Sequence, residues 1–349
     1  MIDLKGRHFL STLDFSVEEI RSIVDFALRM KGDQTMGMLP GRVFGMIFFN
    51  PSVRTRVSSE SAMARMGGHA IALHPGRDTW NFEHREGIVM DGNTQEHVKE
   101  LAPVLSSMCD AVGIRKSELV TTGLSKAEVT TSYDELKQDA FIHAFAKHSR
   151  KPVVNLESNS SHPLQGLADM AAMVEKLDGP PKGKKYVLTW AYHPKPLPVA
   201  TPHSQLLAAA DLGMDVTILR PDGWDLAPEM VEAARGRTES QGGSLTVTAD
   251  QEAAYSGADV VCAKSWGSLD YYGRFDEESA AKDAIRPDWT VDEAKMARTN
   301  DALFMHCLPV RRGIVVTDGV IDSRNSIVTT EAENRLWTVA ALLQCLIAG

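Results

Sequence analysis

Several features that mark common classes of protein are missing from this sequence of 349 residues. It has no tract of basic residues, and its formal net charge is −9, which argues against nucleic acid as a partner. No apolar run is long enough to cross a bilayer. No G-x-G-x-x-G motif follows an expected strand, which argues against a dinucleotide site. These absences favour a soluble enzyme whose positive charge is concentrated locally.

The cysteines and histidines lack the spacings of a disulfide framework or a metal site. The four cysteines lie far apart and form no C-x-x-C pair. With no signal peptide recognisable, we expect reduced thiols in a cytoplasmic protein. The histidines between residues 69 and 97 are interpreted as ordinary surface or half-buried side chains, and no metal or cofactor is expected. The residues concerned are Cys109, Cys262, Cys307, Cys345, His69, His74, His84 and His97.

The rest of the composition is that of an ordinary globular protein. Hydrophobic residues make up 43% and charged residues 24% of the chain, and the length suffices for two domains. Strand-like and helix-like segments alternate in both halves, which predicts an α/β protein with two doubly wound parallel-sheet domains. We expect domains at 1–150 and 151–330, followed by a C-terminal helix at 331–349 that packs back on the first domain. Strands are expected near 43–49, 69–73, 110–114, 152–155, 185–190, 216–220, 260–264 and 302–306. Helices are expected after the N-cap candidate Ser16 and near 56–66, 94–106, 133–148, 204–212, 228–235 and 331–347.

The most informative segment is Phe48-Phe49-Asn50-Pro51-Ser52-Val53-Arg54-Thr55-Arg56. An apolar run ends at Asn50-Pro51, and a helix-like pattern follows. Backbone N–H groups, the helix dipole, hydroxyls and guanidinium groups would converge there on an anion, so the segment predicts a phosphate cradle. The alternative is an ordinary Ser N-cap with solvated arginines.

Polar residues also follow the other expected strands, where ligands bind in open parallel sheets. They carry cations and amides and no clustered carboxylate pair, which suits a phosphorylated or carbonyl-bearing substrate. Each has an ordinary structural interpretation: Arg115 as a surface arginine, His162 as the end of a strand, Cys307 as a buried thiol and Trp80 as a loop plug.

Together, three motifs resemble those of the carbamoyltransferases, the aspartate and ornithine transcarbamylase superfamily. Ser52-Val53-Arg54-Thr55 is similar to the S-x-R-T signature, and His162-Pro163-Leu164-Gln165 to H-P-x-Q. His306-Cys307-Leu308-Pro309 is similar to the H-C-L-P of the ornithine branch. The motifs occur in the family's order, and the resemblance covers essentially the whole chain.

Other segments resemble the N-acetylornithine and N-succinylornithine carbamoyltransferases within that superfamily. The ornithine enzymes' D-x-x-x-S-M-G loop is missing, and Ala263-Lys264-Ser265-Trp266-Gly267 stands in its region. The Pro-rich loop at 189–197, Trp80 and the segment 331–335 match the N-acyl branch. The resemblance implies a homotrimer, a trefoil-knotted second domain and a role in arginine biosynthesis, without metal or cofactor.

The resemblance also implies roles for individual residues in the transfer of a carbamoyl group from carbamoyl phosphate to the δ-amine of an N-acylornithine. The phosphate would be held by the S-x-R-T segment and Arg335, the carbonyl oxygen by Arg115 and His162, and the carbamoyl amide by Gln165. The backbone carbonyls of Cys307 and Leu308 would accept from that amide and orient the acceptor amine, and Trp80 would reach a neighbouring subunit's site. The implied catalytic residues are Arg54, Arg115, His162, Gln165 and Cys307, and the implied substrate-binding residues are Ser52, Val53, Thr55, Trp80, Gln95, Glu157, Lys195, Lys264, Leu308 and Arg335.

The acyl group of the acceptor depends on positions where this chain departs from its branch. Gln95 stands where the N-acetyl branch has glutamate and the N-succinyl branch proline, and Val315 stands where the N-acetyl branch has lysine. Both departures favour a succinyl group or the acceptance of both acyl groups, whereas Tyr192-His193-Pro194-Lys195 and segment 331–335 look more like the N-acetyl branch. We expect N-acetyl-L-ornithine, ahead of N-succinyl-L-ornithine and then ornithine. A non-catalytic phosphate-binding paralogue would be expected to lack Arg115, His162 or Gln165, and all three are present.

Overall fold

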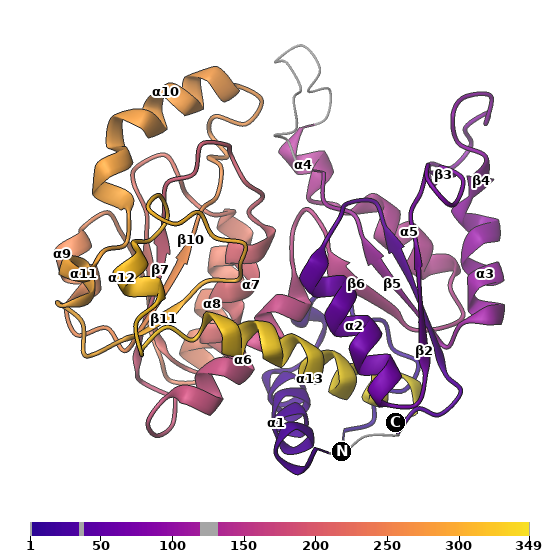
Figure 1. Ribbon diagram of the computed structural model, residues 1–349. Helices are drawn as coiled ribbons and strands as arrows, with labels where there is room; N and C mark the ends of the chain where they lie inside the picture. The colour runs from indigo at the N-terminus through magenta and orange to yellow at the C-terminus, as the bar shows by residue number, and fades with distance from the viewer. Residues whose placement is uncertain (1, 35–37, 119–131, 349) are drawn as a thin grey trace. The chain divides into compact units, whose positions relative to one another are not determined.

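The computed structural model describes residues 2–34, 38–118 and 132–348, which fold into two compact units (Figure 1). Within these residues, unit one contains 2–34, 38–118, 136–164 and 333–348. Unit two contains 132–135 and 165–332. Both units are built on a parallel sheet, as the alternation of strands and helices predicts.

Unit one has a four-stranded parallel sheet in the order β2-β1-β5-β6. Strand β6 pairs with β5 through Val112↔Val153, so the segment after residue 150 belongs to the first sheet. The domain boundary expected at 150 is therefore too early, because the strand that follows it is hydrogen-bonded into unit one. The elements are η1 (Thr12–Asp14), α1 (Val17–Asp33), β1 (Val43–Phe48), α2 (Val53–Arg65), β2 (His69–Leu73), β3 (Phe82–Glu83), β4 (Glu96–His97), α3 (Val98–Met108), β5 (Ala111–Arg115), α5 (Ala140–His148) and β6 (Val153–Glu157).

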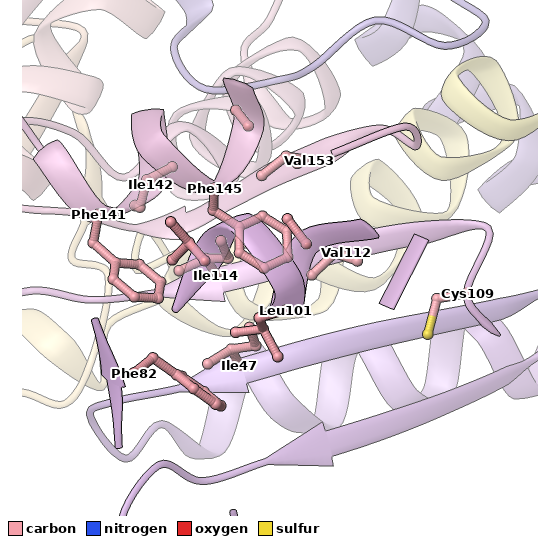
Figure 2. Close-up of a cluster of buried hydrophobic side chains, with 13 residues drawn as sticks. Ile47, Phe82, Leu101, Cys109, Val112, Ile114, Phe141, Ile142, Phe145 and Val153 are labelled. Atoms are coloured by element: carbon pink, nitrogen blue, oxygen red, sulfur yellow. The ribbon is translucent and has the colours of Figure 1, made fainter. Parts of the chain in front are cut away.

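One face of this sheet packs against α3 and α5 in an apolar core. Ile47, Val112 and Ile114 from the sheet lie against Leu101 of α3 and Phe145 of α5, and all five are buried (Figure 2). Side chains alternate across a strand, so Phe44, Met46 and Phe48 of β1 point to the opposite face, and they are buried too. Both faces are therefore covered, as in a doubly wound fold.

Helix α13 (Val328–Ile347) contacts both α1 and α2 within unit one. Lys31 Nζ of α1 donates to Asn334 Oδ1 at 3.0 Å, and the guanidinium of Arg65 lies 5.9 Å from the ring centre of Trp337. The sequence around Ser16 predicts the start of α1, and Ser16 Oγ accepts from the N–H of Glu19 in a capping box.

Unit two has a five-stranded parallel sheet in the order β11-β10-β7-β8-β9. All twelve residues of α7 are buried. Its Asp211 accepts two hydrogen bonds from Arg237 of α8, at 2.8 and 3.0 Å. The remaining elements are α4 (Tyr133–Leu136), α6 (Pro163–Lys176), β7 (Lys185–Trp190), α7 (Ala200–Asp211), β8 (Asp215–Leu219), α8 (Pro228–Ser240), β9 (Leu245–Thr248), α9 (Gln251–Tyr255), β10 (Val260–Lys264), α10 (Phe275–Ile285), η3 (Arg286–Trp289), α11 (Glu293–Met296), β11 (Leu303–Met305) and α12 (Asp318–Ile321).

Among the elements that differ from the sequence prediction, three do so for identifiable reasons. The helix expected at 133–148 is broken at Asp139, which has a φ of 47° and accepts from the N–H of Asn159 at 2.8 Å and the hydroxyl of Ser160 at 2.5 Å. The helix expected from 94 begins only at Val98, because residues 96–97 pair with Phe82–Glu83 as a short parallel ladder. Strand β9 was not predicted, since it is a short edge strand with a mostly exposed or half-buried pattern.

Helices long and apolar enough to span a membrane are not found among the described residues. In the same part of the chain, no three His, Cys, Asp or Glu side chains are arranged to hold a metal ion.

Candidate active site

The candidate residues fall into one group in each unit, mostly at the carboxyl ends of adjacent strands. In unit one, β1, β5 and β6 are neighbours in the sheet, and the segments 50–55, 115–118 and 157–162 follow them. In unit two, β7, β10 and β11 are neighbours, and the segments 191–199, 264–268 and 306–312 follow them. Parallel strands end at the same edge of a sheet, which is where open α/β sheets bind their ligands.

The Ser52 to Thr55 segment is the first turn of α2, as the sequence predicts. Ser52 is the N-cap, and its Oγ accepts from the N–H of Thr55 at 3.3 Å. The first N–H groups of a helix lack partners within the helix, and the helix dipole favours an anion beside them. The Ser cap and the anion cradle, which stood as alternatives in the sequence, are therefore compatible in one turn.

A cation of the C-terminal helix contacts this turn. Arg335 is buried, and its Nη2 donates to Thr55 Oγ1 at 3.1 Å. Val53 is 73% exposed, so only its backbone N–H suits a contact with an anion. Arg54 is half-buried in the turn. Arg56 faces away, because its Nε donates to Glu60 at 2.7 Å.

Arg115 joins the cradle through the end of the sheet. Its carbonyl accepts from the N–H of Phe49 at 2.9 Å, and Asn50 Oδ1 accepts from the N–H of Ser117 at 2.8 Å. Thus the segment after β5 is hydrogen-bonded to the residues that lead into Ser52. Asn50 was noted in the sequence only as a strand end, although its side chain holds this junction.

Glu157 contacts both Arg115, at the end of β5, and His162, in the segment after β6. Its Oε2 pairs with Arg115 Nη1, and it lies 3.4 Å from His162 Nε2. The Arg115 and Glu157 side chains are only 13% and 12% exposed, so the interpretation of Arg115 as a surface arginine is wrong. Charge-assisted pairs of this kind fix orientation. Glu157 therefore positions Arg115 and His162, a role that the sequence did not specify.

Trp80 and Gln95 lie beside the short β3–β4 ladder. The N–H of Gln95 donates to the carbonyl of Asn81 at 3.0 Å, which ties the two loops together. Trp80 is 59% exposed, and Gln95 is exposed as well. The interpretation of Trp80 as a loop plug is therefore wrong, because a plug would be buried, and an exposed indole remains available to a ligand or a partner.

In unit two, His193 connects the Pro-rich loop to the segment after β11. Arg311 Nε donates to His193 Nε2 at 2.9 Å, which leaves the ring proton on Nδ1, where the carbonyl of Lys195 accepts at 2.8 Å. Burial lowers the pKa of His193 to about 4, the hydrogen bond to Lys195 opposes that effect, and the nearby charges of Arg311 and Lys264 add to it. The ring is therefore neutral near pH 7.

Lys195 and Lys264 both belong to this edge of unit two. Lys195 is exposed on the loop and Lys264 is half-buried at the end of β10. The carbonyl of Lys264 accepts from the N–H of Ala191 at 3.0 Å, and Ser265 Oγ donates to the carbonyl of Tyr192 at 3.3 Å. These bonds join the Pro-rich loop to the segment after β10.

The His306-Cys307-Leu308 turn is held by two hydrogen bonds. The His306 N–H donates to Glu331 Oε2 at 2.9 Å, and His306 Nδ1 accepts from the N–H of Leu308 at 2.9 Å. Leu308 has a φ of 52°, a left-handed conformation that is unfavourable for leucine and persists only where its surroundings enforce it. Cys307 is half-buried, so the expectation of a fully buried thiol is wrong. The three other cysteines are buried thiols.

Gln165 lies in the first turns of α6 and is buried. Its Nε2 donates to Asp169 Oδ1 at 2.7 Å, one helical turn further on. Asp169 was not predicted, although its spacing of four residues from Gln165 places both side chains on one face of a helix that starts at Pro163.

The family models of the aspartate/ornithine carbamoyltransferases match almost the whole chain. The model of the carbamoyl-P binding domain matches residues 7–175, and the model of the Asp/Orn binding domain matches residues 199–346.

Individual relatives extend this match over the full length. The chain is 41% identical to the N-acetylornithine carbamoyltransferase of Xanthomonas campestris pv. campestris, over 98% of both chains. It is 36% identical to the N-succinylornithine carbamoyltransferase of Bacteroides thetaiotaomicron, over 95% of this chain and 96% of the relative.

Solved structures agree with the sequence relatives. An acetylornithine transcarbamylase complexed with acetylcitrulline superposes with a TM-score of 0.92 at 41% identity, over 98% of this chain and 100% of that one. A mutant N-acetyl-L-ornithine transcarbamylase, in which an alanine replaces one glutamate, is complexed with carbamyl phosphate and N-succinyl-L-norvaline, and it matches with a TM-score of 0.91 at the same identity and coverage. The chain belongs to the aspartate/ornithine carbamoyltransferase family, in the branch of the N-acetylornithine and N-succinylornithine carbamoyltransferases.

Proposed function

We propose that the protein transfers the carbamoyl group of carbamoyl phosphate to the δ-amine of an N-acyl-L-ornithine, with N-acetyl-L-ornithine as the favoured acceptor. The observation that carries the proposal is the edge of the first sheet. There the residues that lead into the Ser52 helix start are hydrogen-bonded to the segment after β5, and Glu157 holds Arg115 and His162 beside it. A phosphate site beside two donors suits an acyl phosphate. The 41% identity to an N-acetylornithine carbamoyltransferase supports the same reaction.

Unit one supplies the groups for the donor. The N–H groups at the start of α2, with Ser52, Arg54, Thr55 and Arg335, bind the phosphate. Arg115 and His162 donate to the carbonyl oxygen, which becomes an oxyanion when the amine attacks. Donors that are already oriented stabilise this charge without reorganising, and the buried pair with Glu157 provides that orientation.

Unit two supplies the groups for the carbamoyl amide and the acceptor amine. Gln165 and the carbonyls of Cys307 and Leu308 hold the carbamoyl amide, and the same carbonyls orient the δ-amine of the acceptor. The amine attacks the carbonyl carbon, a tetrahedral intermediate forms and phosphate leaves. An unperturbed alkyl amine has a pKa of about 10.4 and must lose its proton before attack, so activity rises towards alkaline pH.

Acyl selection rests on Gln95, with Lys195 and Lys264 in unit two. The resemblance places a glutamate of the N-acetyl branch at position 95, and a carboxylate there would repel the extra carboxylate of a succinyl group. Gln95 is exposed and removes this repulsion. N-succinyl-L-ornithine is therefore the second candidate acceptor, and Val315, which is buried, points the same way because it stands in for a lysine.

The finer organisation follows the family. Unit one is the carbamoyl phosphate-binding part and unit two the N-acylornithine-binding part. The active form is a homotrimer in which Trp80 reaches a neighbouring site, and unit two contains the trefoil knot of its branch. The reaction serves arginine biosynthesis in the cytoplasm, which the four thiols favour. Sedimentation equilibrium of the full chain tests the trimer, and a monomer with full activity would contradict it.

The deciding experiment is a colorimetric assay for ureido product with three acceptors in parallel. Ornithine, N-acetyl-L-ornithine and N-succinyl-L-ornithine are each incubated with the protein and carbamoyl phosphate, and a reaction without carbamoyl phosphate is the blank. We expect product from an N-acylated acceptor and little from ornithine. Turnover of ornithine alone would reject the acceptor, and no product from any of the three would reject the reaction.

A further inference from the structure

A chain of buried polar groups in unit two links two segments assigned to the substrate. It contains Gln165 and Asp169 on α6, His306 after β11 and Glu331 at the start of α13. All four residues are at most 3% exposed. Buried polar groups are costly unless they are hydrogen-bonded, so an arrangement of this kind within a core calls for a physical explanation.

The Asp169 carboxylate selects one end of the Gln165 amide. A carboxylate only accepts hydrogen bonds, whereas an amide has a donor end and an acceptor end. Because Asp169 Oδ1 accepts from Gln165 Nε2 at 2.7 Å, the acceptor Oε1 is directed elsewhere. An amide that binds the –NH₂ of a carbamoyl group must present this oxygen. If the Gln165 amide were flipped, its –NH₂ would face the –NH₂ of the carbamoyl group, and two hydrogen-bond donors would meet.

Glu331 in turn holds Asp169 and the turn at His306. Burial raises the pKa of Glu331 well above its usual value, and the adjacent charge of Asp169 and the hydrogen bond between the two side chains raise it further. Glu331 therefore keeps its proton to a higher pH than a free carboxyl group does, and in that form it donates to Asp169 while its Oε2 accepts from the N–H of His306 at 2.9 Å.

The His306 ring completes the chain. Its Nδ1 accepts from the N–H of Leu308 at 2.9 Å and so enforces the left-handed backbone of that residue. Rotation at residue 308 would turn the carbonyls of Cys307 and Leu308, which are the hydrogen-bond acceptors proposed for the carbamoyl amide and the δ-amine.

From these contacts we propose that Asp169 and Glu331 are positioning residues, which set the amide orientation of Gln165 and the carbonyl directions of the His306 to Leu308 turn for the same carbamoyl group. This inference rests on the proposed function. Neither carboxyl group touches the reactants, and each acts through a residue that does.

Two substitutions that replace a carboxyl by an amide of the same shape give opposite expectations. Glu331→Gln keeps both hydrogen bonds, since its oxygen accepts from His306 and its –NH₂ donates to Asp169. Asp169→Asn offers its oxygen to the Glu331 hydroxyl and turns its –NH₂ towards Gln165, which favours the flipped amide. We expect kcat/KM for carbamoyl phosphate to fall about tenfold or more in Asp169→Asn and to stay within about threefold in Glu331→Gln, as for the loss of one oriented hydrogen bond.

A double-mutant cycle separates positioning from general support of the fold. If Asp169 acts through Gln165, Asp169→Asn should cause little further loss in a Gln165→Leu background, because coupled residues are not additive. Thermal unfolding followed by circular dichroism accompanies each variant. Should Asp169→Asn fail to fold, Asp169→Ser replaces it, since a hydroxyl also donates and accepts.

The outcomes distinguish this inference from the proposed function. An unsubstituted protein that makes no ureido product rejects the function itself. An active protein in which Asp169→Asn and Glu331→Gln lose the same amount, or in which the Asp169 and Gln165 losses multiply fully, rejects the positioning role and leaves the function intact.

Discussion

The two sheet edges use different physical means to build their sites. In unit one the edge relies on charge, with Arg115 paired to Glu157 and Arg335 bonded to Thr55 beside a helix start. In unit two it relies on backbone groups and weakly charged side chains, with a neutral His193 in the loop and, beneath the turn, Glu331, whose pKa is raised well above its usual value by burial.

This difference explains why one substrate is easier to identify than the other. A phosphate demands cations and N–H groups, which leave a recognisable pattern such as Ser52 to Thr55 in the sequence. Backbone carbonyls and loop positions leave a weaker pattern, because many side chains are compatible with the same carbonyl. The carbamoyl donor can therefore be identified from the sequence. The acyl group of the acceptor is harder to identify, because it depends on a few side chains such as Gln95.

The largest effect that would test the charged edge comes from Arg54. Arg54→Ala should lower kcat/KM at least about 10³-fold, because it removes a cation from the phosphate and from the developing charge. The matched control is Arg56→Ala. Arg56 lies two residues after Arg54 on the same helix, and its side chain is paired with Glu60. Initial rates of ureido formation measure both variants. Equal rates for Arg54→Ala and wild type would remove the cradle from the mechanism.

The next effect concerns the carboxylate that orients the two carbonyl donors. Glu157→Gln should lower kcat by about 100-fold, because Arg115 and His162 lose the charge that holds them in place. Asp110→Asn is the control, since Asp110 pairs with Arg42 at 2.9 Å at the start of the same β5 strand. A parallel drop of kcat in both variants would show that Glu157 supports the sheet rather than the site.

A smaller effect is expected at residue 95, which is proposed to select the acyl group of the acceptor. Gln95→Glu should lower kcat/KM for N-succinyl-L-ornithine about tenfold relative to N-acetyl-L-ornithine, as expected for repulsion between two partly solvated carboxylates. Asn93→Asp adds the same charge two residues away on the same loop and should leave the ratio unchanged. Competition between the two acceptors in one reaction measures the ratio of their kcat/KM values. An unchanged ratio in Gln95→Glu would show that residue 95 does not select the acyl group.

The smallest expected effect is that of the His193 ring on the pH dependence of stability. Its pKa is about 4 in the folded protein and about 6.5 in an unfolded chain, so the unfolded state binds more protons between these values. The free energy of unfolding should therefore fall as the pH drops from 6.5 towards 4. His193→Gln should remove that part of the slope, as measured by urea unfolding at several pH values. Identical slopes for both proteins would contradict the neutral ring.

Much of the framework was predictable because it follows from local patterns. The apolar run of β1, the Ser16 cap and the alternation of strands and helices are all set by residues adjacent in sequence, and the structure has them in place. The break at Asp139 was not predictable, because the bonds that cause it come from residues 159 and 160, some twenty positions away.

The site divides in the same way. Ser52 to Thr55 and His162 to Gln165 could be identified as short motifs, whereas the partners that orient them could not. Glu157 meets Arg115 across a pair of strands 42 residues apart in sequence, and Glu331 meets His306 only when α13 folds against the end of β11. Contacts between distant segments leave no local periodicity to detect.

The double use of Ser52 has a consequence for the lifetime of the protein in a cell. Its hydroxyl caps α2 at the same turn that is proposed to hold phosphate, so bound donor also secures the start of that helix. A ligand that binds only the folded state at 100 times its Kd adds about 2.7 kcal/mol of stability, and degradation follows the unfolded fraction. We therefore expect the protein to be degraded faster when carbamoyl phosphate runs out, so that supply of the donor sets the abundance of the protein as well as its rate.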